Sequence, residues 1–164
     1  MRIANRLALI LFVLVACVGC DQTTKSAAQS YLPHSEAWSF LGDTVRLQLV
    51  HNNGAFLSLG ACLPEIWRYT LFNICTGVLL LGLFGYALFA KRITSMGVFA
   101  IALYFSGGVS NLADRWAYGG YVVDFINLGL GPLRSGIFNV ADIFIMAGAL
   151  ILVANALHSR RNDF

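Results

Sequence analysis

Apolar residues in this chain gather into four long runs that are separated by more polar segments. The runs predict helices over about 7–28, 66–90, 94–115 and 137–157. About 20 consecutive apolar residues are enough for a helix to cross the hydrocarbon core of a bilayer. The pattern therefore predicts four membrane spans within a single polytopic domain that covers residues 1–164.

The two longer polar segments, about 29–65 and 116–136, show a different pattern. Apolar and polar residues alternate from Thr44 to Val50, which is typical of a strand, and a turn signal follows at residues 51–54. The second segment is rich in glycine and aromatic residues, and we expect it to add strands to the first. The predicted fold class is an all-α membrane protein, a four-helix transmembrane bundle with a small periplasmic β-element.

Composition supports a membrane protein. The chain is 58% hydrophobic and only 12% charged, with a mean hydropathy of +0.71. Soluble domains contain about 25% charged residues. The net charge of +3 reflects the flanks of the spans, so no nucleic-acid partner is expected.

The basic residues at the ends of the runs predict the orientation. With four spans, one side of the membrane carries Arg2, Arg6, Lys91, Arg92, Arg160 and Arg161. Positive residues concentrate in cytoplasmic loops, so this side is predicted to be cytoplasmic. Both termini are then cytoplasmic, and the two polar segments face the periplasm.

The first run allows two other interpretations. Arg2 and Arg6 before the short run Leu7–Cys20 are typical of a secretory signal peptide, and residues 14–17 are similar to a lipobox. The chain would then be a lipidated envelope protein anchored through Cys17. Three further apolar runs favour a retained first span instead. If its helix continues to about residue 28, Asp21 and Lys25 can pair at positions i and i+4.

Three aspartates stand out in a chain that is otherwise short of charge. Asp114, Asp124 and Asp142 lie between residues 107 and 145, the latter two in very apolar surroundings. Burying an ionised carboxylate is costly unless it is paired, hydrogen-bonded or protonated. In membrane proteins such residues indicate function. We predict that Asp124 and Asp142 share one acid–base site that needs neither a metal nor a cofactor.

The chemistry of such a pair is specific. Two carboxyl groups in one site do not both ionise easily, so they hold one proton between them. The ionised group can accept a proton from water, while the protonated group polarises a carbonyl and later donates to a leaving amine. Because the pair titrates as a unit, neither role is assigned to one residue.

Simpler roles remain open for each aspartate. Asp142 would occupy the third position of a helix capped by Asn139, where a carboxylate is favourable. Asp114 could pair with Arg115 or another base, and Asp124 could cap a turn. A membrane scaffold or a transporter subunit could use aspartates to bind a cation or relay protons. That class predicts aspartates in the middle of facing spans, whereas these lie near one end.

Taken together, the motifs resemble those of signal peptidase II, the bacterial lipoprotein signal peptidase. They appear in order as Asp21-Gln22-x-Thr24-Lys25, Asn52-x-Gly54-Ala55, Gly107-Gly108-x-x-Asn111-x-x-Asp114-Arg115, Val123-Asp124-Phe125 and Phe138-Asn139-x-Ala141-Asp142. Each motif alone is weak, but the ordered set between the spans is specific. The sequence departs from the family pattern at Phe56, which comes one position early.

The resemblance implies a membrane aspartic endopeptidase with Asp124 and Asp142 as the catalytic dyad. It implies that the substrate is oriented by Asn52, Gly54, Asn111, Arg115 and Asn139, and that structural roles fall to Asp21, Lys25 and Asp114. The substrate would be a prolipoprotein with a diacylglyceryl-modified cysteine, cleaved just before that cysteine. The resemblance also implies a monomer among the lipids of the bacterial inner membrane, with the active site toward the periplasm.

Overall fold

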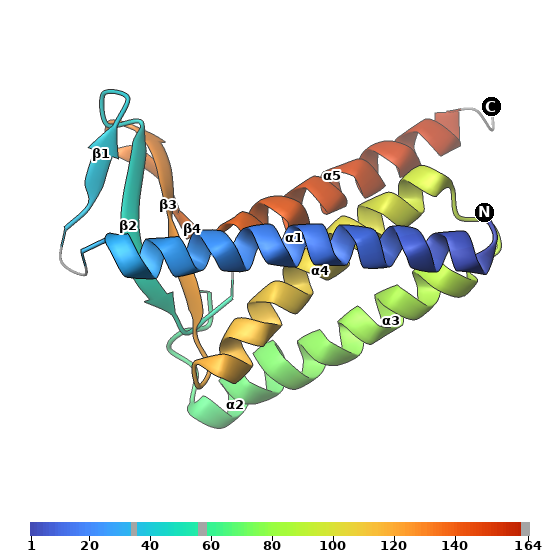
Figure 1. Ribbon diagram of the computed structural model, residues 1–164, viewed down its shortest axis with the longest axis horizontal. Coiled ribbons are helices and arrows are strands. Elements are labelled where there is room, and N and C mark those ends of the chain that lie inside the picture. The colour runs from blue at the N-terminus through green and yellow to red at the C-terminus, as the bar shows by residue number, and fades with distance from the viewer. Residues whose placement is uncertain (34–35, 56–58, 162–164) are drawn as a thin grey trace.

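The computed structural model describes residues 1–33, 36–55 and 59–161, which form a helical bundle with a small sheet across one end (Figure 1). The helices are α1 (Ile3–Tyr31), α2 (Glu65–Tyr69), η2 (Thr70–Cys75), α3 (Thr76–Phe89), α4 (Ser95–Ala117) and α5 (Val140–Arg161). The strands are β1 (Trp38–Phe40), β2 (Val45–Asn52), β3 (Val122–Leu130) and β4 (Leu133–Phe138). The departure from the family pattern at Phe56 lies outside the described residues.

The prediction of four long apolar helices is confirmed, but residues 137–138 of the fourth predicted span belong to β4, and its helix begins at Val140. Within the described ranges, four helical stretches are long and apolar enough to cross a membrane, namely Ile3–Tyr31, Glu65–Phe89, Ser95–Ala117 and Val140–His158. The second of these combines α2, η2 and α3, so its middle is π-helical rather than α-helical. The outer faces carry exposed apolar side chains such as Phe12 and Val15, as expected for contact with lipid.

Helix α4 lies at the centre of the bundle. In its most apolar stretch 61% of the residues are buried, against 17–22% in the other three spans. Small residues allow this packing. A Cβ on Gly107 would overlap the carbonyl oxygen of Ala141, and one on Gly148 would come within 2.6 Å of the carbonyl oxygen of Ala100. Gly107 and Gly148 therefore allow α4 and α5 to approach closely.

The sheet is antiparallel in the order β1-β2-β3-β4. The expectation that the second polar segment adds strands is confirmed, because β3 pairs along β2 and β4 pairs along β3. Strand β2 also runs two residues further than predicted, and it includes His51 and Asn52. Asn52 pairs with Val122, and Val50 pairs with Asp124. This pairing places Asn52 and Asp124 at the end of the sheet that meets the helices.

A hydrophobic cluster fixes the sheet to the bundle. Ala28 and Leu32 at the end of α1 pack with Leu49 on β2 and with Val123 and Phe125 on β3. Strand β3 thereby lies beside the end of α1, and the β3–β4 hairpin leads directly into α5. Asn139, just before α5, and Asp124 on β3 are held close together, although they are 15 positions apart in the sequence.

The opposite end of the bundle holds a buried arginine. Arg6 was predicted as one of the basic flanking residues, but its side chain is only 6% exposed. Its guanidinium donates to the carbonyl oxygens of Ala87, Leu88 and Ala90, at 3.2, 3.1 and 2.7 Å. These carbonyls belong to the C-terminal end of α3, where no intrahelical donors remain. Arg6 therefore caps α3 and ties α1 to it.

Candidate active site

The two predicted dyad residues lie on different elements and both are buried. Asp124 is on β3 and is 2% exposed, while Asp142 is in the first turn of α5 and is 9% exposed. The Asp124 carboxylate accepts hydrogen bonds from Nδ2 of Asn52 at 2.8 Å and from Nδ2 of Asn139 at 2.7 Å. Each oxygen of this carboxylate therefore faces a side-chain amide.

Asp142 has both its predicted helical role and a place in the site. Its backbone N–H donates to Oδ1 of Asn139 at 3.0 Å, and the backbone N–H of Asn139 donates to Oδ2 of Asp142 at 3.2 Å. This reciprocal pair is a capping box. The other oxygen, Oδ1 of Asp142, accepts from Nδ2 of Asn111 at 2.9 Å. The prediction that Asp142 takes part in capping the helix is correct. Its second carboxylate oxygen remains available to bind Asn111.

Two asparagines connect the carboxylates. Nδ2 of Asn139, which donates to Asp124, also lies 3.1 Å from Oδ1 of Asn111, and Asn111 in turn donates to Asp142. Burial raises the pKa of Asp124 to about 7, and the nearby charge of Asp142 acts in the same direction. The hydrogen bonds from Asn52 and Asn139 oppose this shift in the pKa. Near neutral pH, Asp124 can therefore both hold and release a proton.

A buried ion cluster lies directly behind the asparagines. Nζ of Lys25 is 2.7 Å from Oδ2 of Asp21 and 2.8 Å from Oδ2 of Asp114, and it donates to Oδ1 of Asn111 at 2.9 Å. Lys25, Asp21 and Asp114 are each at most 1% exposed. The predicted pairing of Asp21 with Lys25 is confirmed, and the base that pairs with Asp114 is Lys25.

Each acid of this cluster binds the backbone next to one of the two predicted dyad residues. Asp21 accepts the N–H of Ala141 at 2.8 Å, directly before the aspartate on α5. Asp114 accepts the N–H of Val123 at 3.2 Å, directly before the aspartate on β3. Because both acids pair with Lys25, their bonds to the two backbone N–H groups fix the relative position of the two predicted dyad residues. Asp21, Lys25 and Asp114 thus have the contacts that the expected structural roles require.

Arg115 connects α4 to the segment after β2. Its guanidinium donates to the carbonyl oxygen of Gly54 at 2.9 Å and lies 5.6 Å from the ring centroid of Phe72. The N–H of Gly54 donates to Oδ1 of Asn52 at 2.8 Å, which orients the amide that binds Asp124. Among the described residues, Nε of Arg115 has no acceptor. Asn52, Gly54 and Arg115 are therefore connected by hydrogen bonds, and their role in orienting a substrate stays a prediction.

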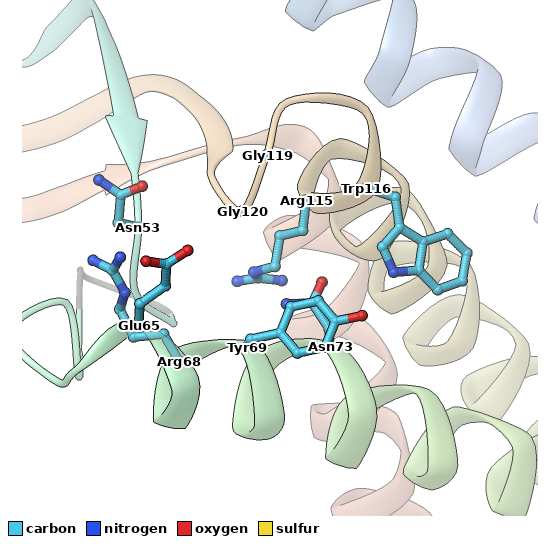
Figure 2. A pocket seen from close by; sticks show the side chains of 9 residues that line it. All are labelled: Asn53, Glu65, Arg68, Tyr69, Asn73, Arg115, Trp116, Gly119 and Gly120. Carbon is cyan, nitrogen blue, oxygen red and sulfur yellow. The ribbon is translucent and has the colours of Figure 1, made fainter.

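A polar cavity of about 370 Å³ opens beside Arg115. It is lined by Asn53, Glu65, Arg68, Tyr69, Asn73, Arg115, Trp116, Gly119 and Gly120. Figure 2 shows Tyr69 and Asn73 on the helix of the second span, across the cavity from Arg115 and Trp116. This hollow has room for an extended peptide segment next to Arg115.

Three polar residues of this region were not predicted to have a role. Ser110 donates to Oδ2 of Asp21 at 2.6 Å, and Gln22 donates to Oδ1 of Asp114 at 2.7 Å. A role for Ser110 could have been predicted from helical spacing, because Ser110 lies four residues before Asp114 on the same face of α4. Asn73, a single amide in an apolar run, is buried beside the cavity.

Within the described residues, no group of three or more His, Cys, Asp or Glu side chains is arranged to hold a metal ion. The four cysteines, including Cys17 and Cys20, are free thiols. Metal independence of the site stays a prediction.

Comparisons with known proteins agree with the geometry. A family model described as signal peptidase (SPase) II matches residues 13–158. The lipoprotein signal peptidase of Mycobacterium tuberculosis (strain ATCC 25618 / H37Rv) is 35% identical over 154 residues, which cover 91% of this chain and 71% of the relative. That of Treponema denticola is 36% identical over 151 residues, or 89% of this chain and 87% of the relative.

Solved structures show the same fold. A structure described as a bacterial membrane enzyme, obtained by the in meso method at 2.3 Å resolution, superposes with a TM-score of 0.80 at 24% identity. The match covers 98% of this chain and 92% of the other. A second such structure, at 1.9 Å resolution, gives a TM-score of 0.73 over 94% of this chain and 93% of the other, also at 24% identity.

Proposed function

The chain belongs to the signal peptidase II family, and on that premise we propose that Asp124 and Asp142 form its catalytic pair. Its activity is that of a membrane aspartic endopeptidase that cleaves the signal peptides of lipoproteins. The observation that carries the assignment is that two buried carboxylates are joined through Asn139 and Asn111. The pKa of Asp124, raised to about 7 by burial, supports a shared proton.

The proposed reaction uses the pair as one acid and one base. The ionised carboxylate accepts a proton from a water molecule, whose oxygen adds to the carbonyl carbon of the scissile amide. The protonated carboxyl donates to the carbonyl oxygen as charge develops on it. The carboxyl group that took the proton from water then donates it to the amide nitrogen, and the C–N bond breaks. As the carbonyl re-forms, a hydroxyl group of the tetrahedral intermediate returns its proton to the other carboxylate, so the pair again holds a single proton. The two carboxyl groups titrate together, so the roles belong to the pair.

The surrounding residues have distinct proposed roles. Asn52, Asn111 and Asn139 orient the carboxylates through the hydrogen bonds described above. Arg115 lines the polar cavity and donates to the carbonyl oxygen of Gly54, and we propose that these two residues position the peptide of the substrate. Asp21, Lys25 and Asp114 fix the backbone behind the pair. Pre-organisation of this kind keeps reacting groups within the small tolerance that catalysis requires.

The membrane arrangement is also part of the proposal. The chain is a multi-pass membrane protein, and we propose a single polytopic domain with both termini in the cytoplasm of a bacterium. The polar segments at about 29–65 and 116–136, with the sheet and the active site, then face the periplasm. The distribution of basic residues supports this orientation. We further propose that the protein acts as a monomer among the lipids of the inner membrane.

The test is a cleavage assay with the full-length protein in detergent micelles. It compares one precursor in two forms, with and without a diacylglyceryl group on the lipobox cysteine. We expect cleavage of the modified precursor only, directly before the modified cysteine. Asp124→Asn and Asp142→Asn should each abolish cleavage while the protein remains folded. A matched control is Asp43→Asn, which changes a carboxylate that is 39% exposed in the turn between β1 and β2. Wild-type activity in either dyad variant would refute the assignment.

A further inference from the structure

The second span contains a buried amide without a hydrogen-bond partner. Asn73 lies in the π-helical segment η2 and its side chain is only 6% exposed. No described residue donates a hydrogen bond to its side chain or accepts one from it, and Asn73 lines two cavities, so its amide is available to a ligand there. Short π-helical segments are frequent at functional sites. Both features suggest that a ligand completes this position.

Asn73 lies where two cavities of opposite character meet. The polar cavity on one side is lined by charged residues that include Glu65, Arg68 and Arg115. The other is an apolar groove of about 470 Å³ between α3 and α4, with walls that include Gly77 and Leu112. Both cavities are lined by Tyr69, Asn73 and Trp116. The lining therefore changes from polar to apolar at Asn73.

The apolar groove is open to the membrane. Its edge on the second span is formed by Ile74, Val78 and Leu81, which are 52%, 65% and 70% exposed. From Tyr69 to Leu81 the groove follows the helix for about 18 Å at the usual rise per residue. A lipid chain can therefore enter the groove sideways from the bilayer without crossing the sheet.

We propose that Asn73 is a specificity-determining residue whose amide donates a hydrogen bond to an ester carbonyl of the substrate's diacylglyceryl group. This inference rests on the proposed function. The occupant of the groove is an acyl chain of that group, and the peptide occupies the polar cavity near Arg115. The parts of the substrate follow one another as the two cavities do. Its polar peptide matches the polar cavity, its acyl chains match the apolar groove, and its ester groups lie between them, at Asn73. An ester carbonyl only accepts hydrogen bonds, and Nδ2 of Asn73 is a donor.

The test compares two synthetic substrates that differ only at the lipid linkage. One carries the natural diester, and the other carries a diether with chains of equal length and no carbonyl groups. We expect the wild-type protein to favour the diester in kcat/KM by roughly three- to tenfold, because a single neutral hydrogen bond makes a modest contribution. Asn73→Leu should lose this preference and process both substrates at the rate of the diether. The matched control is Thr70→Val, which removes an exposed hydroxyl group from the same helical segment.

A second variant tests the groove itself. A Cβ at Gly77 would lie 3.9 Å from the nearest atom, Cδ2 of Leu112, so Gly77→Leu fills the groove without displacing backbone. We expect a higher KM for the lipidated substrate with little change in kcat. Gly82→Leu is the control, because a Cβ there has open space and Gly82 does not line the groove. An unchanged KM in Gly77→Leu would exclude the groove as the acyl site.

The outcomes separate this inference from the proposed function. A wild-type protein that cleaves neither lipidated substrate, or that cleaves unmodified precursors equally well, contradicts the proposed function. A wild-type protein that cleaves both lipidated substrates with equal kcat/KM overturns only the role of Asn73. The same conclusion follows if Asn73→Leu slows both substrates equally and keeps their ratio, because that result indicates a purely structural side chain.

Discussion

Replacing Asp124 with asparagine should make the protein inactive and, at alkaline pH, more stable. The variant keeps the size of a side chain that is 2% exposed but removes its ability to ionise. In the wild-type protein burial raises the pKa of Asp124 from 3.8 to about 7. The folded state therefore binds this proton more tightly than the unfolded state. Its contribution to stability is complete below about pH 4 and is lost as the pH rises through about 7.

The magnitude follows from the shift in the pKa. A shift of about three units corresponds to about 4 kcal/mol over the whole window, of which about 3 kcal/mol is lost between about pH 5 and pH 8. The variant avoids this loss. It also loses one acceptor, because the new amide cannot accept from both Asn52 and Asn139, which costs about 1 kcal/mol. Asp124→Asn should therefore be about 3 kcal/mol more stable than wild type at about pH 8, and within about 1 kcal/mol of it at about pH 5.

The assay is equilibrium unfolding in detergent micelles, followed by tryptophan fluorescence across this pH range and combined with the cleavage assay. Asp43→Asn is the control. The hydrogen bond from Arg46 holds the pKa of Asp43 well below its usual range, so this residue is ionised throughout the window. The control should retain the pH dependence of wild type. Parallel pH profiles for Asp124→Asn and wild type would refute the reasoning, because they would show that burial does not control the charge of Asp124.

Three further predictions concern the surroundings of the pair. Lys25→Met leaves two buried carboxylates without their cation, and it should lower the free energy of unfolding by about 3–5 kcal/mol in the same unfolding assay. Gly107→Ala brings a Cβ into the carbonyl oxygen of Ala141; it should cost about 1–3 kcal/mol and reduce kcat, whereas Gly82→Ala, with open space around it, should do neither. Because the pair needs one proton, kcat/KM should fall as the pH rises above about 7, the value to which burial raises the pKa of Asp124; a flat profile up to about pH 9 would contradict a shared proton.

The pattern of apolar and polar residues predicted the four spans, strand β2 and the types of residue in the site. Apolar runs predict membrane helices because the length of the run must match the bilayer, and alternation predicts strands because successive side chains point to opposite faces. The pairing of Asp21 with Lys25 was also predictable, since it depends only on the spacing within one helix. The π-helical segment η2 was not, because its apolar sequence resembles that of any other membrane helix.

Only the tertiary structure decided which polar groups meet. Lys25 on α1 pairs with Asp114 on α4, and Asn139, which follows β4, donates to Asp124 on β3. The position of Asn73 between a polar cavity and an apolar groove likewise depends on how the second span packs beside α4. Local periodicity fixes the face on which a side chain lies. The partner on that face depends on how distant elements pack, and that packing is set by small residues such as Gly107 and by the cluster that holds the sheet to α1.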